Sequence, residues 1–268
     1  MVNFINTAPI YETWKQTVHR PEWRVTEAPP SELNRLLSQG ELDLGFVSSH
    51  EYGADPAKYQ ILGDLSISAT GAVGSVFLFS KHRPEELSGK TVYLSPLSQT
   101  SNSLIKIILE EFYQVRPNYA VSNFQAKPAA SETALLAIGD RALRLLEDDC
   151  FPIVLDLSQI WQQHTGLPFV FAVWAVRQEF CLKQAGCIAE IHGELLRCLR
   201  QGKENLPAIC ELVAPRIPME VGQCQTYLSN MEYDLGPQKV KALELFYQYL
   251  IKRGEARPEA LPLKIVSI

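Results

Sequence analysis

The apolar run at residues 165–177 constrains the fold more than any other segment of the chain. Between Thr165 and Arg177 no side chain carries a charge or a hydroxyl group, and Thr-Gly followed by Pro168 marks the start of the run. Pro168 argues against a helix through the segment, and a membrane helix would need about 20 apolar residues. The run therefore predicts a buried strand that crosses the middle of the fold.

The composition indicates a globular protein with a core and gives no sign of a nucleic-acid or membrane partner. With 268 residues, the chain is long enough for one large domain or two smaller ones. The net charge of -5 comes without any basic block, so neither nucleic acid nor an anionic membrane is expected to bind. The first ten residues lack a basic segment followed by a long apolar one, which predicts a cytoplasmic protein without a secretory signal.

Cysteine and histidine spacings predict neither a metal site nor a cofactor. All six cysteines follow position 149, and none forms a C-x-x-C pair or a zinc-type spacing with histidine, so we interpret them as packing residues. The five histidines are scattered, and His50, at the end of an expected strand, is the one of interest. Phosphate loops, dinucleotide fingerprints and nucleophile elbows are not found in the sequence.

Up to residue 177 the chain alternates apolar segments with amphipathic ones, which predicts an α/β fold with a parallel-type sheet covered on both faces. The expected strands are 2–5, 23–27, 42–47, 59–62, 65–68, 75–80, 91–94, 119–124, 134–138, 151–157 and the apolar run. Helices are expected after Pro30, over 102–113 and from Arg141; beyond 177 only helices are expected, over 179–201, 206–214, 219–231 and 237–253. The charged segment 81–89 contains Pro84 and predicts a connection between two halves.

Small polar residues follow several of the expected strands, where ligands bind in open α/β sheets. They are Asn6 and Thr7, Ser48 and Ser49, Ser98 to Ser101, and Gly139 with Asp140. Unpaired amides at helix starts favour an anion by about 0.3 to 1 kcal/mol each at an exposed site, so we expect a small carboxylate or phosphate ligand. Taken one at a time, such residues are also ordinary helix caps, and that alternative stays open.

Several segments, in unbroken order along the chain, resemble the chorismate dehydratases of the futalosine route to menaquinone. They are residues 2–9, 40–43, 47–52, 74–80, 138–140, 155–157 with Trp161, and 165–175. The sister enzyme, the 1,4-dihydroxy-6-naphthoate synthase, shares the Thr-Gly-Leu-Pro start of the apolar run, but Phe-Val-Phe-Ala-Val-Trp-Ala is similar to the dehydratase side. The sequence departs from the family at Ala72, where proline is expected, and at Gly74, where a basic residue is expected.

The resemblance implies a two-lobed fold like that of periplasmic binding proteins of type 2, with a central cleft and two hinge segments. Residues 1–79 and 175–268 would form one discontinuous lobe, and residues 80–174 the other. Chorismate would lie in the cleft and lose water to give 3-[(1-carboxyvinyl)oxy]benzoate, in a lyase reaction that needs no cofactor and no metal.

The resemblance also implies roles for individual residues. Asn6 and Ser75 match polar positions that the family uses around the substrate, and we expect them to be catalytic. The expected substrate-binding residues are Thr7, Ser48, Ser49, Ser98, Gln99, Thr100, Ser101, Gly139, Asp140 and Phe169. Two alternatives remain: a cytoplasmic binding protein for small carboxylates without catalysis, and the sister synthase.

Overall fold

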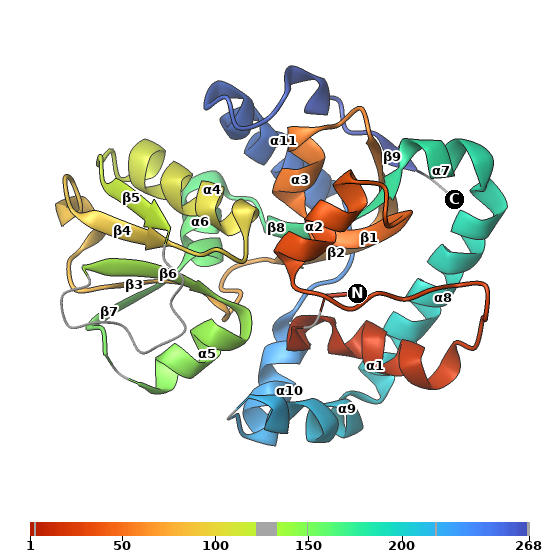
Figure 1. The fold of residues 1–268 in the computed structure, drawn as a ribbon. Helices are drawn as coiled ribbons and strands as arrows, with labels where there is room; N and C mark the ends of the chain where they lie inside the picture. The colour runs from red at the N-terminus through yellow and green to blue at the C-terminus, as the bar shows by residue number, and fades with distance from the viewer. Residues whose placement is uncertain (3, 122–132, 149, 218, 267–268) are drawn as a thin grey trace.

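The structure is a computed structural model that describes residues 1–2, 4–121, 133–148, 150–217 and 219–266 (Figure 1). Its described residues form two lobes, each built on one sheet. The first lobe has a four-stranded sheet in the order β1-β8-β2-β9, from β1 (Leu44–Ser48), β2 (Tyr59–Ala69), β8 (Phe169–Arg177) and β9 (Ile265–Val266). The second lobe has a five-stranded sheet in the order β5-β4-β6-β3-β7, from β3 (Val76–Ser80), β4 (Thr91–Leu94), β5 (Asn118–Val121), β6 (Ala134–Ile138) and β7 (Ile153–Asp156).

The apolar run forms β8, an inner strand of the first sheet, which confirms the predicted buried strand. It pairs antiparallel with β1 on one side and with β2 on the other. Val173 and Val176 are fully buried, and each valine side chain contributes roughly 1.5–3 kcal/mol of hydrophobic stabilisation. The strand begins only at Phe169, because helix α6 (Leu157–Thr165) extends to Thr165 and ends at Gly166, whose φ of 71° is left-handed.

Helices cover both lobes, and most of the expected ones are present. The first lobe carries α1 (Ala8–Thr17), α2 (Pro30–Ser38), α3 (Ser49–Ala54), α7 (Gln178–Lys183), α8 (Ala185–Glu204), α9 (Leu206–Val213), α10 (Val221–Asn230) and α11 (Pro237–Lys252). The second lobe carries α4 (Gln99–Ile107), which continues as a π-helical turn (Ile108–Phe112), α5 (Gly139–Glu147) and α6. Short 3-10 turns lie at Ile5–Thr7, Pro84–Glu86, Ala214–Arg216 and Pro258–Ala260.

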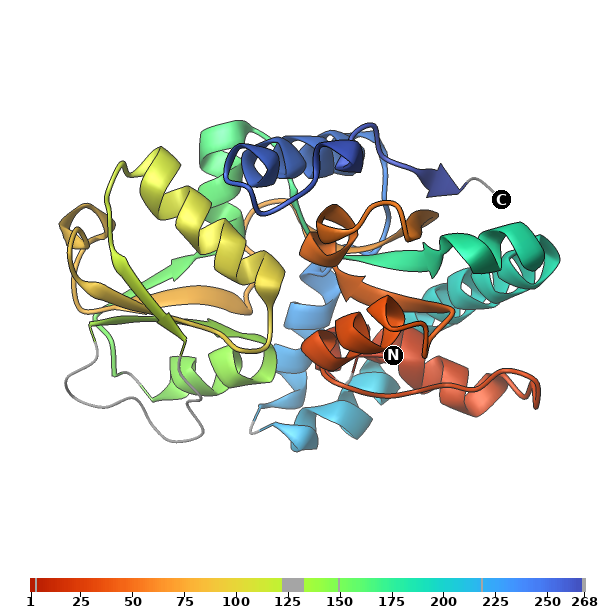
Figure 2. The same ribbon diagram turned by 45° about the horizontal axis from the view of Figure 1, so that its top comes forward.

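Two close packing arrangements hold these helices in place. In α8, Gly202 lies so close to α1 that an added Cβ would stand 1.8 Å from the carbonyl oxygen of Pro9. Helix α11 lies along the top of both lobes in Figure 2, and Phe246 in it packs against Trp161 and Phe169. One large hydrophobic core runs through both lobes, and a second, smaller cluster around Phe79 and Phe151 lies in the second lobe.

The sheets are mixed, which corrects the expected parallel-type sheet. Strands β4 and β5 are parallel, as are β4 and β6, whereas β3 and β8 are antiparallel to both of their neighbours. These two strands are the ones that follow a crossing between the lobes. Each of these two strands enters its sheet from the other lobe. It is therefore antiparallel to its neighbours, which are connected within their own lobe by crossover helices.

Strand pairing also places the crossings between lobes differently from the expected boundaries after 79 and after 174. Strand β3 pairs with β6 and β7, so residues 76–80 go with the second sheet, and all of β8 goes with the first. Residues 170–174 lie beside the second half of β2, from Ser66, and not beside residues 75–79. We propose that the two crossings, 70–75 and 166–168, are the hinge segments. The charged segment 81–89 joins β3 to β4 within the second lobe.

Other strand predictions at the N-terminus were wrong. Residues 23–27 are not a strand, and Val2 forms only an isolated bridge with Ala28, because the chain turns into a 3-10 helix at Ile5. The strands expected at 59–62 and 65–68 are one strand, β2, whose pairing with β8 shifts register around Asp64. The end of the strand expected at 119–124 falls outside the described residues.

Cys198, Cys210 and Cys224 are buried and free, as expected of packing residues. The prediction was wrong for Cys150, which is exposed, and Cys181 and Cys187 are only half-buried. Over the described part of the chain, none of the helices combines the length and apolar character needed to cross a membrane.

Candidate functional site

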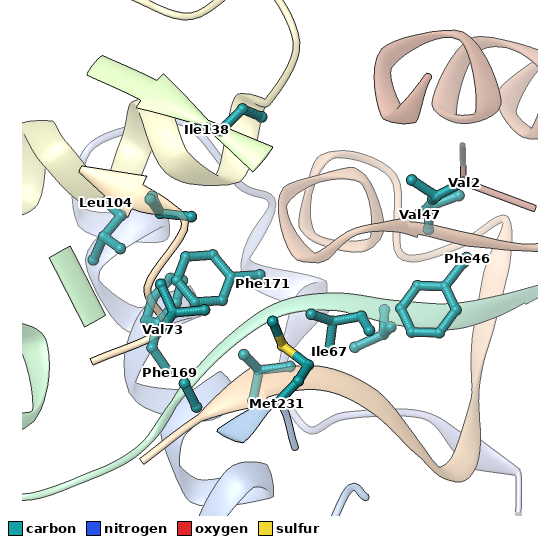
Figure 3. Close-up of a cluster of buried hydrophobic side chains, with 14 of the residues drawn as sticks. Val2, Phe46, Val47, Ile67, Val73, Leu104, Ile138, Phe169, Phe171 and Met231 are labelled. Carbon is teal, nitrogen blue, oxygen red and sulfur yellow. The ribbon is translucent and has the colours of Figure 1, made fainter. Parts of the chain in front are cut away.

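A cavity with an empty volume of about 630 Å³, part of it open to solvent, lies between the two lobes. Apolar side chains form most of its wall, and Figure 3 shows Phe46, Ile67 and Met231 among them. Its described lining consists of Val2, Phe4, Asn6, Thr7, Pro30, Phe46, Val47, Ser48, Ile67, Val73, Ser75, Val76, Ser98, Ser101, Ile138, Gly139, Phe171, Ala172 and Met231.

The cavity brings together seven of the residues expected at the site. They come from both lobes, from the 3-10 turn Ile5–Thr7 and from positions next to the ends of β1, β3, β4 and β6: Asn6, Thr7, Ser48, Ser75, Ser98, Ser101 and Gly139. Residues far apart in sequence therefore meet in this cavity. The predicted convergence of polar strand ends is therefore a property of this fold.

Five expected residues do not line the cavity, and most of their side chains have partners elsewhere. They are Ser49, Gln99, Thr100, Asp140 and Phe169. Ser49 donates to the carbonyl oxygen of Val170 at 2.7 Å, and the hydroxyl of Thr100 accepts from the backbone N–H of His50 at 2.9 Å. Phe169 packs among aromatic rings of the core.

Asp140 lies one residue beyond the cavity lining, in the first turn of α5. Among the described residues, its buried Oδ1 atom has no hydrogen-bond partner, and burial raises the pKa of its carboxyl group. Gln99 accepts from the side-chain amide of Asn34 at 3.2 Å.

Ser75 is fixed by contacts on both sides of its backbone. The preceding residue, Gly74, has a φ of 74°, and its N–H donates to Oδ2 of Asp156 at 2.7 Å. The carbonyl oxygen of Ser75 accepts from the N–H of Gly139 at 2.7 Å. The hydroxyl of Tyr227 donates to Oγ of Ser75 at 2.9 Å.

Gly74 stands where the family is expected to carry a basic residue. Its backbone conformation and the space around it show what a side chain would meet at this position. A left-handed φ favours glycine over residues with a Cβ, although an added Cβ would have room, with Tyr227 at 3.7 Å. A side chain here is therefore disfavoured by the backbone conformation rather than by crowding.

Asp156 anchors the segment that carries Ser75. Its Oδ1 accepts from the N–H groups of Ser158 and Gln159 at the start of α6, while Oδ2 holds Gly74. Burial raises the pKa of this carboxyl group, and the N–H donors oppose the shift. The side chain is thus a structural link between α6 and the β2–β3 crossing.

Asn6 approaches the cavity from the first lobe, within the 3-10 turn Ile5–Thr7. Thr7 closes that turn by donating its hydroxyl to the carbonyl oxygen of Val2 at 2.8 Å, and Tyr233 donates to the carbonyl oxygen of Asn6 at 2.9 Å. Oδ1 of Asn6 is buried and has no hydrogen-bond partner in the described structure. Its side-chain amide is therefore available to a ligand in the cavity.

Ser48 is held by Asn34, a residue that the sequence did not point to. The side-chain amide of Asn34 donates to Oγ of Ser48 at 2.8 Å and accepts from the backbone N–H of Ser48 at 3.1 Å. Asn34 is buried on the same helix face as Leu33 and Leu37. A polar residue beside an apolar stripe was the signal that could have identified it.

The electrostatics of the cavity come from neutral groups. Over the described lining there is no Asp, Glu, His, Lys or Arg side chain. Three helices start beside lining residues: α1 after Thr7, α4 after Ser98 and α5 at Gly139. Ser98 caps α4 by accepting from the N–H of Ser101, so the ordinary cap role holds there. The helix starts provide a positive potential that suits carboxylate groups.

The described residues contain no group of three or more His, Cys, Asp or Glu side chains able to hold a metal ion.

A family model described as menaquinone biosynthesis matches residues 1–252. The chain belongs to the menaquinone biosynthesis family. The match confirms the resemblance seen in the sequence, and it extends through most of the C-terminal helices.

Similar proteins of known sequence or structure support both the family and the fold. A curated relative from Thermus thermophilus, named chorismate dehydratase, is 33% identical over 262 residues, which cover 92% of each chain. A solved protein from Archaeoglobus fulgidus aligns with a TM-score of 0.75 at 20% identity, covering 95% of this chain and 96% of the other. A Candida albicans protein described as having the generic periplasmic binding protein fold aligns with a TM-score of 0.66 at 11% identity, covering 99% and 94%. The predicted two-lobed fold is thus confirmed.

Proposed function

We propose that this protein is a chorismate dehydratase of menaquinone biosynthesis, a lyase that works without a cofactor. One observation carries the proposal: Asn6 and Ser75, the two expected catalytic residues, line one cavity from opposite lobes. The relative from Thermus thermophilus with that name supports it across nearly the whole chain. The cytoplasmic location remains a prediction.

The cavity suits a small ring that carries two carboxylates. Apolar side chains such as Phe46, Ile67 and Phe171 can cover the faces of a six-membered ring. The hydroxyl groups of Ser48 and Ser101 can donate to carboxylate oxygens near helix starts. Neutral donors hold a dianion without a buried ion pair, which would cost desolvation of the cation as well.

The chemistry needs orientation more than a strong base. The proton to be lost sits on the ring carbon that bears the enolpyruvyl ether, and the resulting anion is delocalised toward the ring carboxylate. Expulsion of hydroxide from the adjacent carbon then makes the ring aromatic, so that one proton and one hydroxide leave together as water.

The proton acceptor in our proposal is the side-chain carboxylate of the substrate itself. The described lining offers no carboxylate or imidazole to act as a base, which supports this assignment. Asn6 and Ser75 would orient that carboxylate and donate a hydrogen bond to the departing hydroxyl group. Positioning and neutral donors of this kind account for large rate enhancements in enzymes.

Purified protein incubated with chorismate should give an aromatic product, detected by absorbance after chromatography. Asn6→Ala and Ser75→Ala should each reduce kcat by about 100-fold or more, a typical loss when a positioned donor is removed. Ser31→Ala, at an exposed position of α2, is the matched control and should keep the full rate.

Three results would contradict the proposal or its residue roles. Binding of chorismate without product would indicate a binding protein, and conversion of cyclic dehypoxanthine futalosine instead of chorismate would indicate the sister synthase. Near-normal rates in both alanine variants would remove Asn6 and Ser75 from the mechanism.

A further inference from the structure

Two tyrosines of the C-terminal helical region reach the two candidate catalytic residues. Tyr227 lies in α10 and Tyr233 follows that helix, and both side chains are buried. The hydroxyl of Tyr227 donates to the side chain of Ser75, and that of Tyr233 donates to the backbone of Asn6. Figures 1 and 2 show α10 between the two lobes.

The direction of the Tyr227–Ser75 hydrogen bond decides where the hydrogen of Ser75 points. The geometry makes the Tyr227 hydroxyl the donor to Oγ of Ser75, at 2.9 Å. Oγ of Ser75 is then the acceptor, and its own hydrogen is left for another partner. Because Ser75 lines the cavity, that partner is a bound ligand.

The segment that follows α10 is hydrogen-bonded to the sheet of the first lobe. Glu232 exchanges two backbone hydrogen bonds with Ser68 of β2, at 3.0 and 3.1 Å, and the carbonyl oxygen of Tyr233 accepts from the N–H of Ser66 at 2.7 Å. Tyr227 therefore extends from a segment fixed to the first sheet to a serine at the start of the second lobe. Its hydroxyl can orient the Ser75 side chain only while the two lobes keep this spacing.

We propose that Tyr227 is a positioning residue that aims the hydroxyl hydrogen of Ser75 into the cavity. It acts through Ser75 and does not line the cavity itself. The kinetic part of this inference rests on the proposed dehydratase function, whereas the orientation of Ser75 does not. The two parts are therefore tested by different measurements.

The kinetic test compares Tyr227→Phe, Ser75→Ala and the double variant during chorismate dehydration. Tyr227→Phe should lower kcat by about 5- to 20-fold, as expected for one lost hydrogen bond, and leave KM within about twofold. The double variant should be no slower than Ser75→Ala, because Tyr227 has no role once the serine hydroxyl is gone. Tyr249→Phe, which removes a hydroxyl from α11, should keep the full rate.

A purely structural role predicts a different pattern. In that case Tyr227→Phe would slow the Ser75→Ala variant as much as the original protein, and the proposal would be overturned. Thermal unfolding gives a second cycle: Ser75→Ala leaves the buried Tyr227 hydroxyl unpaired, so adding Tyr227→Phe should raise the melting temperature. A further decrease in the double variant would also contradict the pairing.

Crystal structures of the original protein and of Tyr227→Phe test the orientation without any turnover. The Ser75 side chain should occupy one rotamer in the original protein and several in the variant. An unchanged single rotamer in the variant would overturn the proposal. If the protein forms no aromatic product from chorismate, the proposed function fails, and the rotamer comparison still decides whether Tyr227 positions Ser75.

Discussion

Oδ2 of Asp156 accepts a hydrogen bond from the backbone N–H of Gly74 at 2.7 Å, which joins the start of α6 to the residue before Ser75. The same carboxylate caps α6 through Ser158 and Gln159. One side chain thereby ties α6 of the second lobe to the crossing at residues 70–75. The placement of Ser75 depends on this carboxylate.

Replacing this carboxylate should therefore affect both stability and activity. Asp156→Asn puts an amide in place of one oxygen, so it can keep the helix cap or the contact with Gly74 but not both. We expect a loss of about 1–3 kcal/mol in the free energy of unfolding, measured by urea denaturation, and a lower kcat. Glu259→Gln, at an exposed position, is the control and should change neither. Full stability in Asp156→Asn would show that the link is dispensable.

Asn34 should affect substrate binding more than the chemical step. Its amide holds Ser48 and Gln99 in place, whereas the expected catalytic residues are elsewhere in the cavity. Asn34→Ala should raise KM for chorismate several-fold, about the effect of one hydrogen bond, with a smaller change in kcat. Asn230→Ala, at the exposed end of α10, serves as the control. A fall in kcat at unchanged KM would argue that Ser48 acts in catalysis instead.

The contact of Gly202 with Pro9 gives a matched pair of glycine substitutions in one helix. Gly202→Ala would place Cβ 1.8 Å from a backbone oxygen, so α1 must move away from α8 and stability should fall by about 1–3 kcal/mol. Gly193→Ala meets no atom within 4 Å and should stabilise α8 by roughly 0.5–1 kcal/mol. Denaturant unfolding of both variants checks the pair. Equal effects at the two positions would contradict the close packing.

Because α1 starts directly after the turn that carries Asn6, Gly202→Ala should also reduce activity. Gly193→Ala should leave turnover of chorismate unchanged. A fully active Gly202→Ala protein would mean that α1 can shift without moving Asn6.

His50 should make the protein less stable in mild acid. Burial lowers the pKa of His50, Glu255 raises it and Lys106 lowers it further. Nδ1 is buried and has no hydrogen-bond partner among the described residues. In the unfolded chain its pKa is about 6.5, so the unfolded state binds a proton more readily. The stability is present above about pH 6.5 and is lost as pH falls through the lower pKa of the folded state.

His50→Gln should flatten the change in melting temperature between about pH 7 and pH 5. His19→Gln, at an exposed histidine, is the control and should leave the profile as it is. If the two variants behave alike, His50 is not responsible for the acid sensitivity.

The sequence by itself determined the elements and most of the polar strand ends. Apolar spacing is a local property, so the buried strand, the strands Thr91–Leu94 and Ala134–Ile138, and the helices after Arg177 could be predicted from it. Ser48 and Ser98 were expected in the cavity from their positions after strands, and Asn6 and Ser75 from the family resemblance.

Only the tertiary structure decided the strand directions, the hinge segments and the supporting residues. The direction of β3 and β8 depends on which lobe the chain has just left, which no local pattern records. The partners of Ser75 and Asn6 are tyrosines more than a hundred residues away in sequence, and a tyrosine on a helix looks the same whether its hydroxyl meets a catalytic residue or water. Hydrogen bonds across such separations exist only once the core has packed, because packing is what brings their two ends within 3 Å.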